Sequence, residues 1–173
     1  MKKTITIIML AVLIFSCKSK SGATATTVKN EPVTSTKLDR SSQVAIKGNW
    51  VITSVTFPGS DYIRVSSFNI ADTNCFVGST WNFISNNNKG SMSLTKTDCL
   101  AFSSPIVWSI NKEGVFVLKI VEAGVKSKTV TQGFLLRVAN QTENSFQLID
   151  KINVGGQDKE VTYQFVKIIS TKN

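Results

Sequence analysis

The amino-acid sequence predicts an all-β domain, an eight-stranded antiparallel up-and-down barrel, preceded by a signal and a flexible segment. Three observations support this fold class. From residue 46 onward, short apolar runs alternate with polar positions, and no stretch keeps a helical period for three turns. Clusters of Asn, Gly and Lys separate these runs and suit tight turns, because Asn and Gly adopt positive φ angles at low cost. Only one connection is long, which favours consecutive strands that pair as neighbours.

Residues 1–16 have the pattern of a bacterial export signal. Lys2 and Lys3 form a positively charged start, and the apolar run at residues 4–15 follows them. This run is too short to span a bilayer as a stable helix, so we expect it to be cleaved after export.

The end of that run, Ile14-Phe15-Ser16-Cys17, resembles the bacterial lipobox, in which an aliphatic and a small residue precede an obligatory cysteine. The resemblance implies that Cys17 receives diacylglycerol and that a lipoprotein signal peptidase cleaves before it. Two or three acyl chains hold a protein on a membrane far more firmly than one, since each buried CH₂ contributes about 0.8 kcal/mol. The alternative is an ordinary signal peptide with an incidental cysteine. We expect a lipoprotein, because Cys17 stands where the apolar run ends.

Residues 17–45 are predicted to be a lipid-anchored flexible tether. They are rich in Ser, Thr, Lys and Ala, and they bury too little apolar surface to offset the entropy of ordering. The net charge of +9 falls to +7 without Lys2 and Lys3, and much of this excess lies in the tether. We expect a solvated segment with some attraction to an anionic membrane. The sequence has no basic motif interleaved with aromatic residues, so a nucleic-acid partner is not predicted.

Sorting of the lipoprotein is predicted from the residues that follow Cys17, by resemblance alone. Lys18 stands where enteric bacteria place the Asp that retains lipoproteins in the inner membrane. The tether also lacks an acidic cluster resembling the surface-export tag of the Bacteroidota. We therefore expect an outer-membrane lipoprotein of the cell envelope that faces the periplasm, with exposure at the cell surface as the alternative.

Two further cysteines, Cys75 and Cys99, predict a disulfide in an oxidising compartment. The bridge would close a loop of about 25 residues, for which chain entropy predicts a stabilisation of roughly 3.5 kcal/mol. A metal site and a redox pair are the alternatives. The chain has no His and no Cys-x-x-Cys spacing, so both alternatives are disfavoured.

The domain at residues 46–173 contains eight predicted strands, joined mainly by short turns. The strands are expected at residues 48–57, 79–85, 90–95, 105–111, 114–122, 128–139, 145–151 and 159–169. Residues 86–90 and 111–114 suit tight hairpins, whereas residues 140–144 and 153–158 suit looser turns. The long connection is residues 58–77. Closure into a barrel removes exposed sheet edges, whereas a two-sheet sandwich would need several long connections.

Two blocks of this domain resemble known proteins. Gly48-x-Trp50 at the start of the first strand resembles the lipocalin motif, whose Trp closes one end of the barrel. The stretch from Cys75 to Cys99, with Cys-x-x-Gly-Ser-Thr-Trp entering the second strand, looks like the lipocalin-like lipoproteins of the Bacteroidota. The resemblance covers roughly residues 46–169 and implies a lipocalin-like barrel.

The sequence departs from that family at the residue stacked over the motif Trp. Lipocalins usually have an Arg there, near the last strand, but no Arg follows Arg137. Lys167 shares its alternation with Tyr163 and Phe165, so it could replace the Arg through a cation–π contact. We expect Lys167 to lie within about 6 Å of the Trp50 ring.

Catalysis is not predicted. The absence of His excludes Ser-His-Asp and Cys-His catalysis and the commonest metal ligand. Asp61, Asp72 and Asp98 fall in predicted connections, where we expect them to be solvated. The residues Gly78-Ser79-Thr80 do not match the Gly-x-Ser-x-Gly nucleophile elbow. We expect no catalytic residue, no metal and no cofactor.

Binding of a small hydrophobic molecule, such as a lipid or a pigment, is the predicted function. Alternation in the strands directs apolar and aromatic side chains into the lumen. The candidate ligand contacts are Trp81, Phe83, Trp108, Phe116, Phe134, Phe146 and Tyr163. The alternative is a structural or protein-docking lipoprotein whose side chains fill the barrel, since eight strands leave little interior space. Residues 58–77 would cover the open end under the first interpretation and pack outside the barrel under the second.

Overall fold

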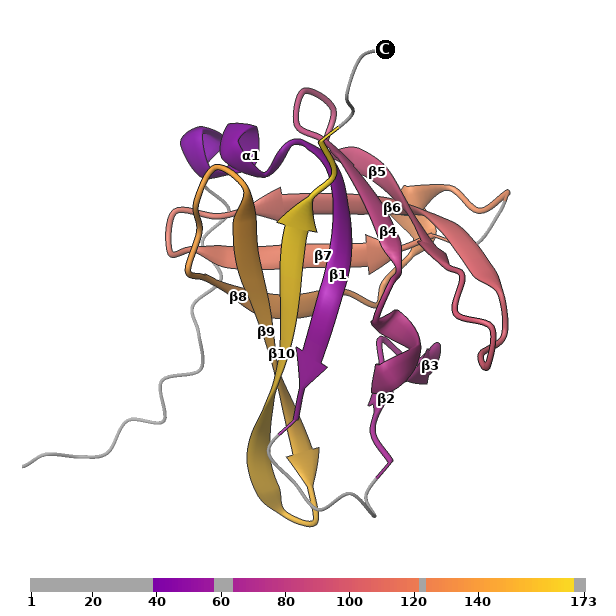
Figure 1. Ribbon diagram of the computed structural model, residues 1–173. Coiled ribbons are helices and arrows are strands. Elements are labelled where there is room, and N and C mark those ends of the chain that lie inside the picture. The colour runs from indigo at the N-terminus through magenta and orange to yellow at the C-terminus, as the bar shows by residue number, and fades with distance from the viewer. Residues whose placement is uncertain (1–38, 58–63, 122–123, 170–173) are drawn as a thin grey trace, which may run out of the picture. The chain divides into compact units, whose positions relative to one another are not determined.

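The computed structural model describes residues 39–57, 64–121 and 124–169, and it confirms the predicted fold class. Eight strands form a closed barrel in the order β1-β10-β9-β8-β7-β6-β5-β4, and all neighbouring pairs are antiparallel (Figure 1). The barrel strands are β1 Gly48–Thr56, β4 Thr80–Ile84, β5 Lys89–Leu94, β6 Phe102–Ile110, β7 Val115–Ile120, β8 Phe134–Ala139, β9 Ser145–Val154 and β10 Gln157–Lys167. The smaller elements are α1 Arg40–Ile46, β2 Ser66–Ser67, β3 Ala71–Asp72, η1 Thr73–Phe76 and η2 Ser127–Thr129.

Several predicted features lie outside the described residues. These are the signal at residues 1–16, the anchor residue Cys17, most of the tether and, within the long connection, residues 58–63 with Asp61. No helix in the described part of the chain is long and apolar enough to cross a membrane.

Helix α1 differs from the prediction, because the sequence places residues 40–45 in the flexible tether. The Asp39 carboxylate caps the helix by accepting hydrogen bonds from Ser41 and Ser42, and these bonds lower the pKa of Asp39 to about 2. Ile46 and Gln43 are fully buried, and the Ile46 carbonyl accepts a 2.7 Å hydrogen bond from the Trp50 indole. The cap and this burial together order the segment.

Several strand boundaries also differ from the prediction, most of all at β8 and at the β9–β10 turn, and β6 begins at Phe102 rather than at residue 105. The expected strand at residues 128–139 begins only at Phe134, because Thr129 bonds twice to the Lys126 carbonyl and closes the short helix η2 instead. The turn expected at residues 153–158 is tighter than predicted. Val154 pairs with Gln157, and only the glycines between them form the loop, with φ angles of 60° and 83°. Positive φ at both loop residues is the geometry of a two-residue hairpin.

Aromatic side chains fill the lumen toward the α1 end of the barrel, which we call the closed end. Phe146 stacks on Phe165 with ring centroids 4.5 Å apart, and Trp108 stacks on Phe116 at 5.6 Å. Phe83 contacts rings from both pairs in edge-on or tilted arrangements. All of these side chains are buried, so this half of the barrel is a packed core.

The predicted disulfide is present. Cys75 in η1 and Cys99 in the β5–β6 connection are joined, with Cα atoms 5.8 Å apart. The bridge ties the end of the long connection to a second connection at the same end of the barrel. That end, opposite α1, is called the open end below.

Candidate ligand-binding site

The closed end is formed around Trp50, whose side chain is fully buried. Trp50 lies between β4 and β10, opposite Trp81 and Lys167, and its ring meets the Phe146 ring edge-on at 4.7 Å. The ammonium of Lys167 lies 5.6 Å from the centroid of the Trp50 ring, so the expected cation–π contact is present. Because the Trp50 side chain is fully buried, it offers no exposed surface to a ligand at the closed end.

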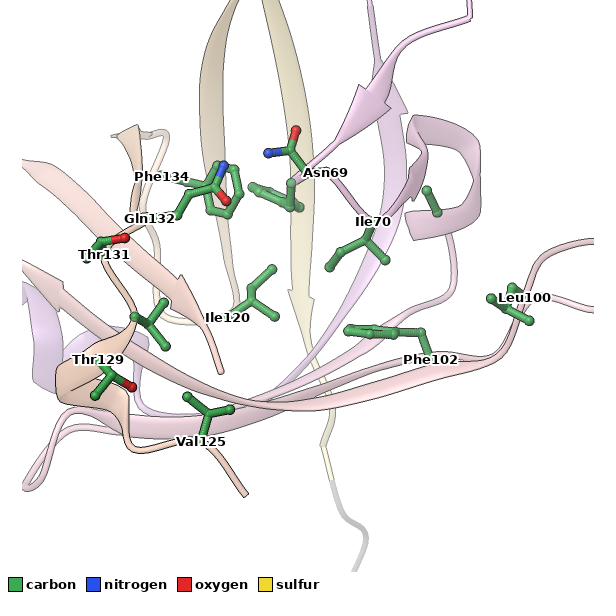
Figure 2. Close-up of a pocket in the computed structure, with 13 residues that line it drawn as sticks. Asn69, Ile70, Leu100, Phe102, Ile120, Val125, Thr129, Thr131, Gln132 and Phe134 are labelled. Carbon is green, nitrogen blue, oxygen red and sulfur yellow. The ribbon is translucent and has the colours of Figure 1, made fainter. Parts of the chain in front are cut away.

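The open end carries a cavity of about 540 Å³. Four segments frame it: the β2–β3 turn, the β5–β6 connection with the start of β6, the end of β7, and the described part of the β7–β8 connection, residues 124–133. The lining residues are Phe68, Asn69, Ile70, Ala71, Leu100, Phe102, Ile120, Val125, Thr129, Val130, Thr131, Gln132 and Phe134. Figure 2 shows Ile70, Phe102 and Ile120 directed into the space between the segments.

Phe68 forms the floor of this cavity. Its ring stacks on the Tyr163 ring at 5.1 Å and meets Phe134 and Phe76 edge-on, both at 5.2 Å. Only 6% of Phe68 is exposed. The Tyr163 hydroxyl donates a 2.6 Å hydrogen bond to Ser67, which fixes the β2–β3 turn over the lumen. Residues 66–72 of the long connection therefore cover the packed core from the open end.

The backbone at this floor is in an unusual conformation. Phe68 and Asn69 have φ angles of 53° and 56°, in the left-handed region that residues with a Cβ rarely adopt. Such positions cost on the order of 1–3 kcal/mol and persist where surrounding contacts compensate. Here the contacts of the Phe68 ring supply that compensation.

Among the seven aromatic residues predicted to contact a ligand, only Phe134 lines the cavity. Tyr163 lies beneath Phe68, and the other five pack in the core: Trp81, Phe83, Trp108, Phe116 and Phe146. Alternation predicts which side chains face the lumen, but it does not show how much free space they leave. Their mutual packing leaves the free volume at the mouth instead.

The sequence reasoning did not identify most of the cavity lining. Ile120 is an exception, because it shares the inward alternation of Phe116 and Leu118 in β7 and is therefore predicted to face the lumen. Asn69, Leu100 and Gln132 lie in turns and connections, where no periodic pattern marks a side chain as lining or exposed.

The wall formed by the β7–β8 connection is held by polar contacts. The ammonium of Lys119, on the outer face of β7, donates a 3.0 Å hydrogen bond to the Val130 carbonyl. Side chains of Asn69, Thr129, Thr131 and Gln132 add hydrogen-bonding groups to a lining that is otherwise apolar. Such a lining can bury an apolar molecule and orient one polar group on it.

Asp150 is an inward-facing carboxyl group near the open end. It shares the alternation of Phe146 and Leu148 in β9 and pairs with Leu136 and Val161. The pKa of Asp150 is raised to about 6 by burial, although the hydrogen bond from the Lys151 backbone lowers this pKa by a smaller amount. Burial also raises the pKa of Tyr163, and the nearby charge of Asp150 adds to that increase.

A closed barrel of eight up-and-down strands is the architecture that lipocalins use to hold one small ligand. No protein-family model matches the chain, and no curated protein matches it. Among solved structures, bovine odorant binding protein in complex with a selenium-containing odorant is similar at 11% identity and a TM-score of 0.44, over 75% of this chain and 74% of that one. The same protein with its natural ligand is similar at 12% identity and a TM-score of 0.42, over 73% and 74%. At these scores we draw no conclusion about function from the similarity.

Proposed function

We propose that the chain is a lipid-anchored envelope protein whose barrel binds a small hydrophobic molecule at its open end. The observation that carries this proposal is the cavity of about 540 Å³. Its volume lies within the roughly 300–1,000 Å³ of small-molecule sites. The anchor is supported by the resemblance of residues 14–17 to the bacterial lipobox, and the outer membrane facing the periplasm is the proposed location.

The chemistry of the lining favours an apolar ligand. Phe68, Ile70, Phe102, Ile120 and Phe134 contribute apolar surface, and no Asp, Glu, Lys or Arg is among the lining residues in the described part of the chain. Apolar surface removed from water contributes about 25 cal/mol per Å², so a mostly apolar molecule gains affinity without having to desolvate a fixed charge.

A cavity-filling variant tests the proposal. Val130→Trp places a large ring in the lining, and it should weaken binding of an uncharged environment-sensitive dye by roughly tenfold or more, equivalent to about 1.4 kcal/mol. Leu135→Trp is the matched control, because Leu135 points outward from β8 and is 46% exposed. Dye binding that is equal in the two variants and the parent would contradict the site.

The natural ligand can be sought directly. Native mass spectrometry of the protein purified from its own membrane should show a co-purifying small molecule in the parent and less of it in Val130→Trp. Repeated absence of any such molecule would count against a carrier function.

The anchor has a separate test. Metabolic labelling with a radioactive fatty acid should label the native chain and leave a Cys17→Ser variant unlabelled. Equal labelling of both chains would contradict acylation at Cys17, and this result is independent of the binding measurements.

The packed core favours a second candidate, a filled barrel that serves as a structural or protein-docking lipoprotein. Buried aromatic rings, among them those of Trp81, Phe83 and Phe165, already occupy the half of the lumen toward Trp50. The two functions differ in one measurement: a filled scaffold predicts no saturable dye binding that depends on Val130.

A further inference from the structure

A second hollow lies outside the barrel, on the other side of the β7–β8 connection. It has a volume of about 580 Å³ and lies against the outer face of β5 and β6. Pro105, Val107 and Val121 give it an apolar floor. Three lysines line it, Lys89, Lys126 and Lys128, and none of its described lining residues is acidic. We call this hollow the basic groove.

The basic groove adjoins the cavity at the mouth. Val125 lines both hollows, and its side chain is 41% exposed. Residues 124–133, the described part of the β7–β8 connection, are thus a thin wall with an apolar cavity on one side and lysines on the other. The hydrogen bonds from Thr129 to Lys126 and from Lys119 to Val130 hold this wall in shape.

We propose that the ligand is an anionic amphiphile, whose apolar tail lies in the mouth cavity and whose acidic head group crosses Val125 to reach Lys126 and Lys128. This inference rests on the proposed function and adds the chemical class of the ligand. A single molecule with an apolar end and a negative end matches the two linings that meet at Val125.

The two ends of such a ligand contribute differently. Burial of the tail supplies most of the affinity, because it removes apolar surface from water. Lys126 and Lys128 are exposed, and ion pairs at exposed sites contribute only about 0–1 kcal/mol each. The lysines therefore select the sign of the head group more than they add affinity, and this selection weakens as salt screens the charges.

The test compares ligands that share one alkyl chain. The protein is the chain from residue 18 onward, which lacks the predicted signal and the anchor cysteine. Displacement of the uncharged dye is measured with dodecanoate, dodecyl phosphate, dodecanol and dodecylamine, each below its micelle concentration. We expect both anions to bind about fivefold more tightly than the alcohol and the amine to bind most weakly. Tighter binding of both anions than of the alcohol would identify negative charge, rather than one head-group geometry, as the recognised property.

Variants assign the preference to the wall. Lys126→Gln combined with Lys128→Gln should abolish the advantage of the anions and leave dodecanol binding unchanged. Lys112→Gln combined with Lys151→Gln removes two exposed charges elsewhere and should keep the advantage. Thermal unfolding of all variants checks that each is folded.

Two outcomes separate this inference from the proposed function. Equal binding of anion and alcohol by the parent, or an anion preference that survives the Lys126 and Lys128 substitutions, would overturn the inference while leaving the hydrophobic site intact. Failure of the dye and of all four ligands to bind would overturn both.

Discussion

At the scale of single residues, the surroundings shift the pKa values of two carboxyl groups in opposite directions. Asp39 accepts hydrogen bonds from Ser41 and Ser42 at the start of α1, which hold its pKa near 2, so it stabilises the fold above the ordinary pKa of 3.8. Asp150 faces the lumen, and burial raises its pKa to about 6. Its charged form therefore destabilises the fold above that pH.

Asp150→Asn should stabilise the protein at pH 7.5. The folded pKa of about 6 lies above the unfolded value of 3.8, so the folded state binds the proton more tightly, and stability falls as the pH rises between these values. Because Asp150 is only partly buried, we expect a gain of about 1–2 kcal/mol in the free energy of unfolding, less than the full shift implies.

Urea unfolding of parent and variant at pH 4.5 and pH 7.5 measures this effect. The gain should be small at pH 4.5 and larger at pH 7.5, and an Asp98→Asn variant in an exposed connection serves as control. A gain of equal size at both pH values would show that burial of the Asp150 charge is not its cause.

At the scale of elements, the β2–β3 turn determines where free volume remains. Two residues in left-handed backbone conformation turn the chain so that Phe68 points into the barrel over Tyr163. The disulfide and the Tyr163–Ser67 hydrogen bond hold this turn from two sides. The depth of the cavity is thus set by the Phe68 side chain in the β2–β3 turn rather than by the barrel strands.

Phe68→Ala should deepen the cavity and destabilise the fold. Removal of a buried Phe ring costs about 3–5 kcal/mol, through lost burial and the space that remains. Urea unfolding measures the loss, and dye titration should show that a bulkier uncharged dye, excluded by the parent, now binds. Phe68→Leu is the control and should lose less stability. If Phe68→Ala kept the stability and the size limit of the parent, Phe68 would not be the floor.

At the scale of the whole molecule, the barrel could be predicted from the sequence because successive side chains of a strand point to opposite faces. Apolar and polar residues therefore alternate along each strand. Val51 and Ile52 in β1, or Val117 and Leu118 in β7, alternate between the two faces, and each expected strand overlaps an observed one. Helix α1 was missed because its stability comes from a cap at Asp39 and from burial of Ile46 against Trp50. A seven-residue segment has no helical period long enough to detect.

The candidate site was harder to predict for a related reason. Trp81 and Trp108 face the lumen as alternation requires, yet their packing against other rings depends on distances that only the closed barrel defines. The residues that frame the cavity, such as Ile70 and Val125, lie in connections brought together from distant parts of the chain. Their proximity is a property of the tertiary structure.

The disulfide should stabilise the molecule as a whole. Replacing both Cys75 and Cys99 with Ser removes a crosslink across a loop of about 25 residues, so we expect a loss of about 3 kcal/mol in the free energy of unfolding. Urea unfolding of the double variant and of the parent under reducing conditions should give similar losses. A double variant as stable as the oxidised parent would contradict a stabilising role for the bridge.

The same bridge also links the two parts of the chain that form the mouth of the cavity. Cys99 precedes Leu100, which lies at the rim of the cavity. Cys75 precedes Phe76, whose ring contacts Phe68 at the floor of the cavity. A newly made chain with reduced cysteines lacks the crosslink between these two parts of the mouth. Reduction of the bridge would therefore loosen the rim and the floor of the cavity together, so the shape of the mouth depends on the redox state of its surroundings.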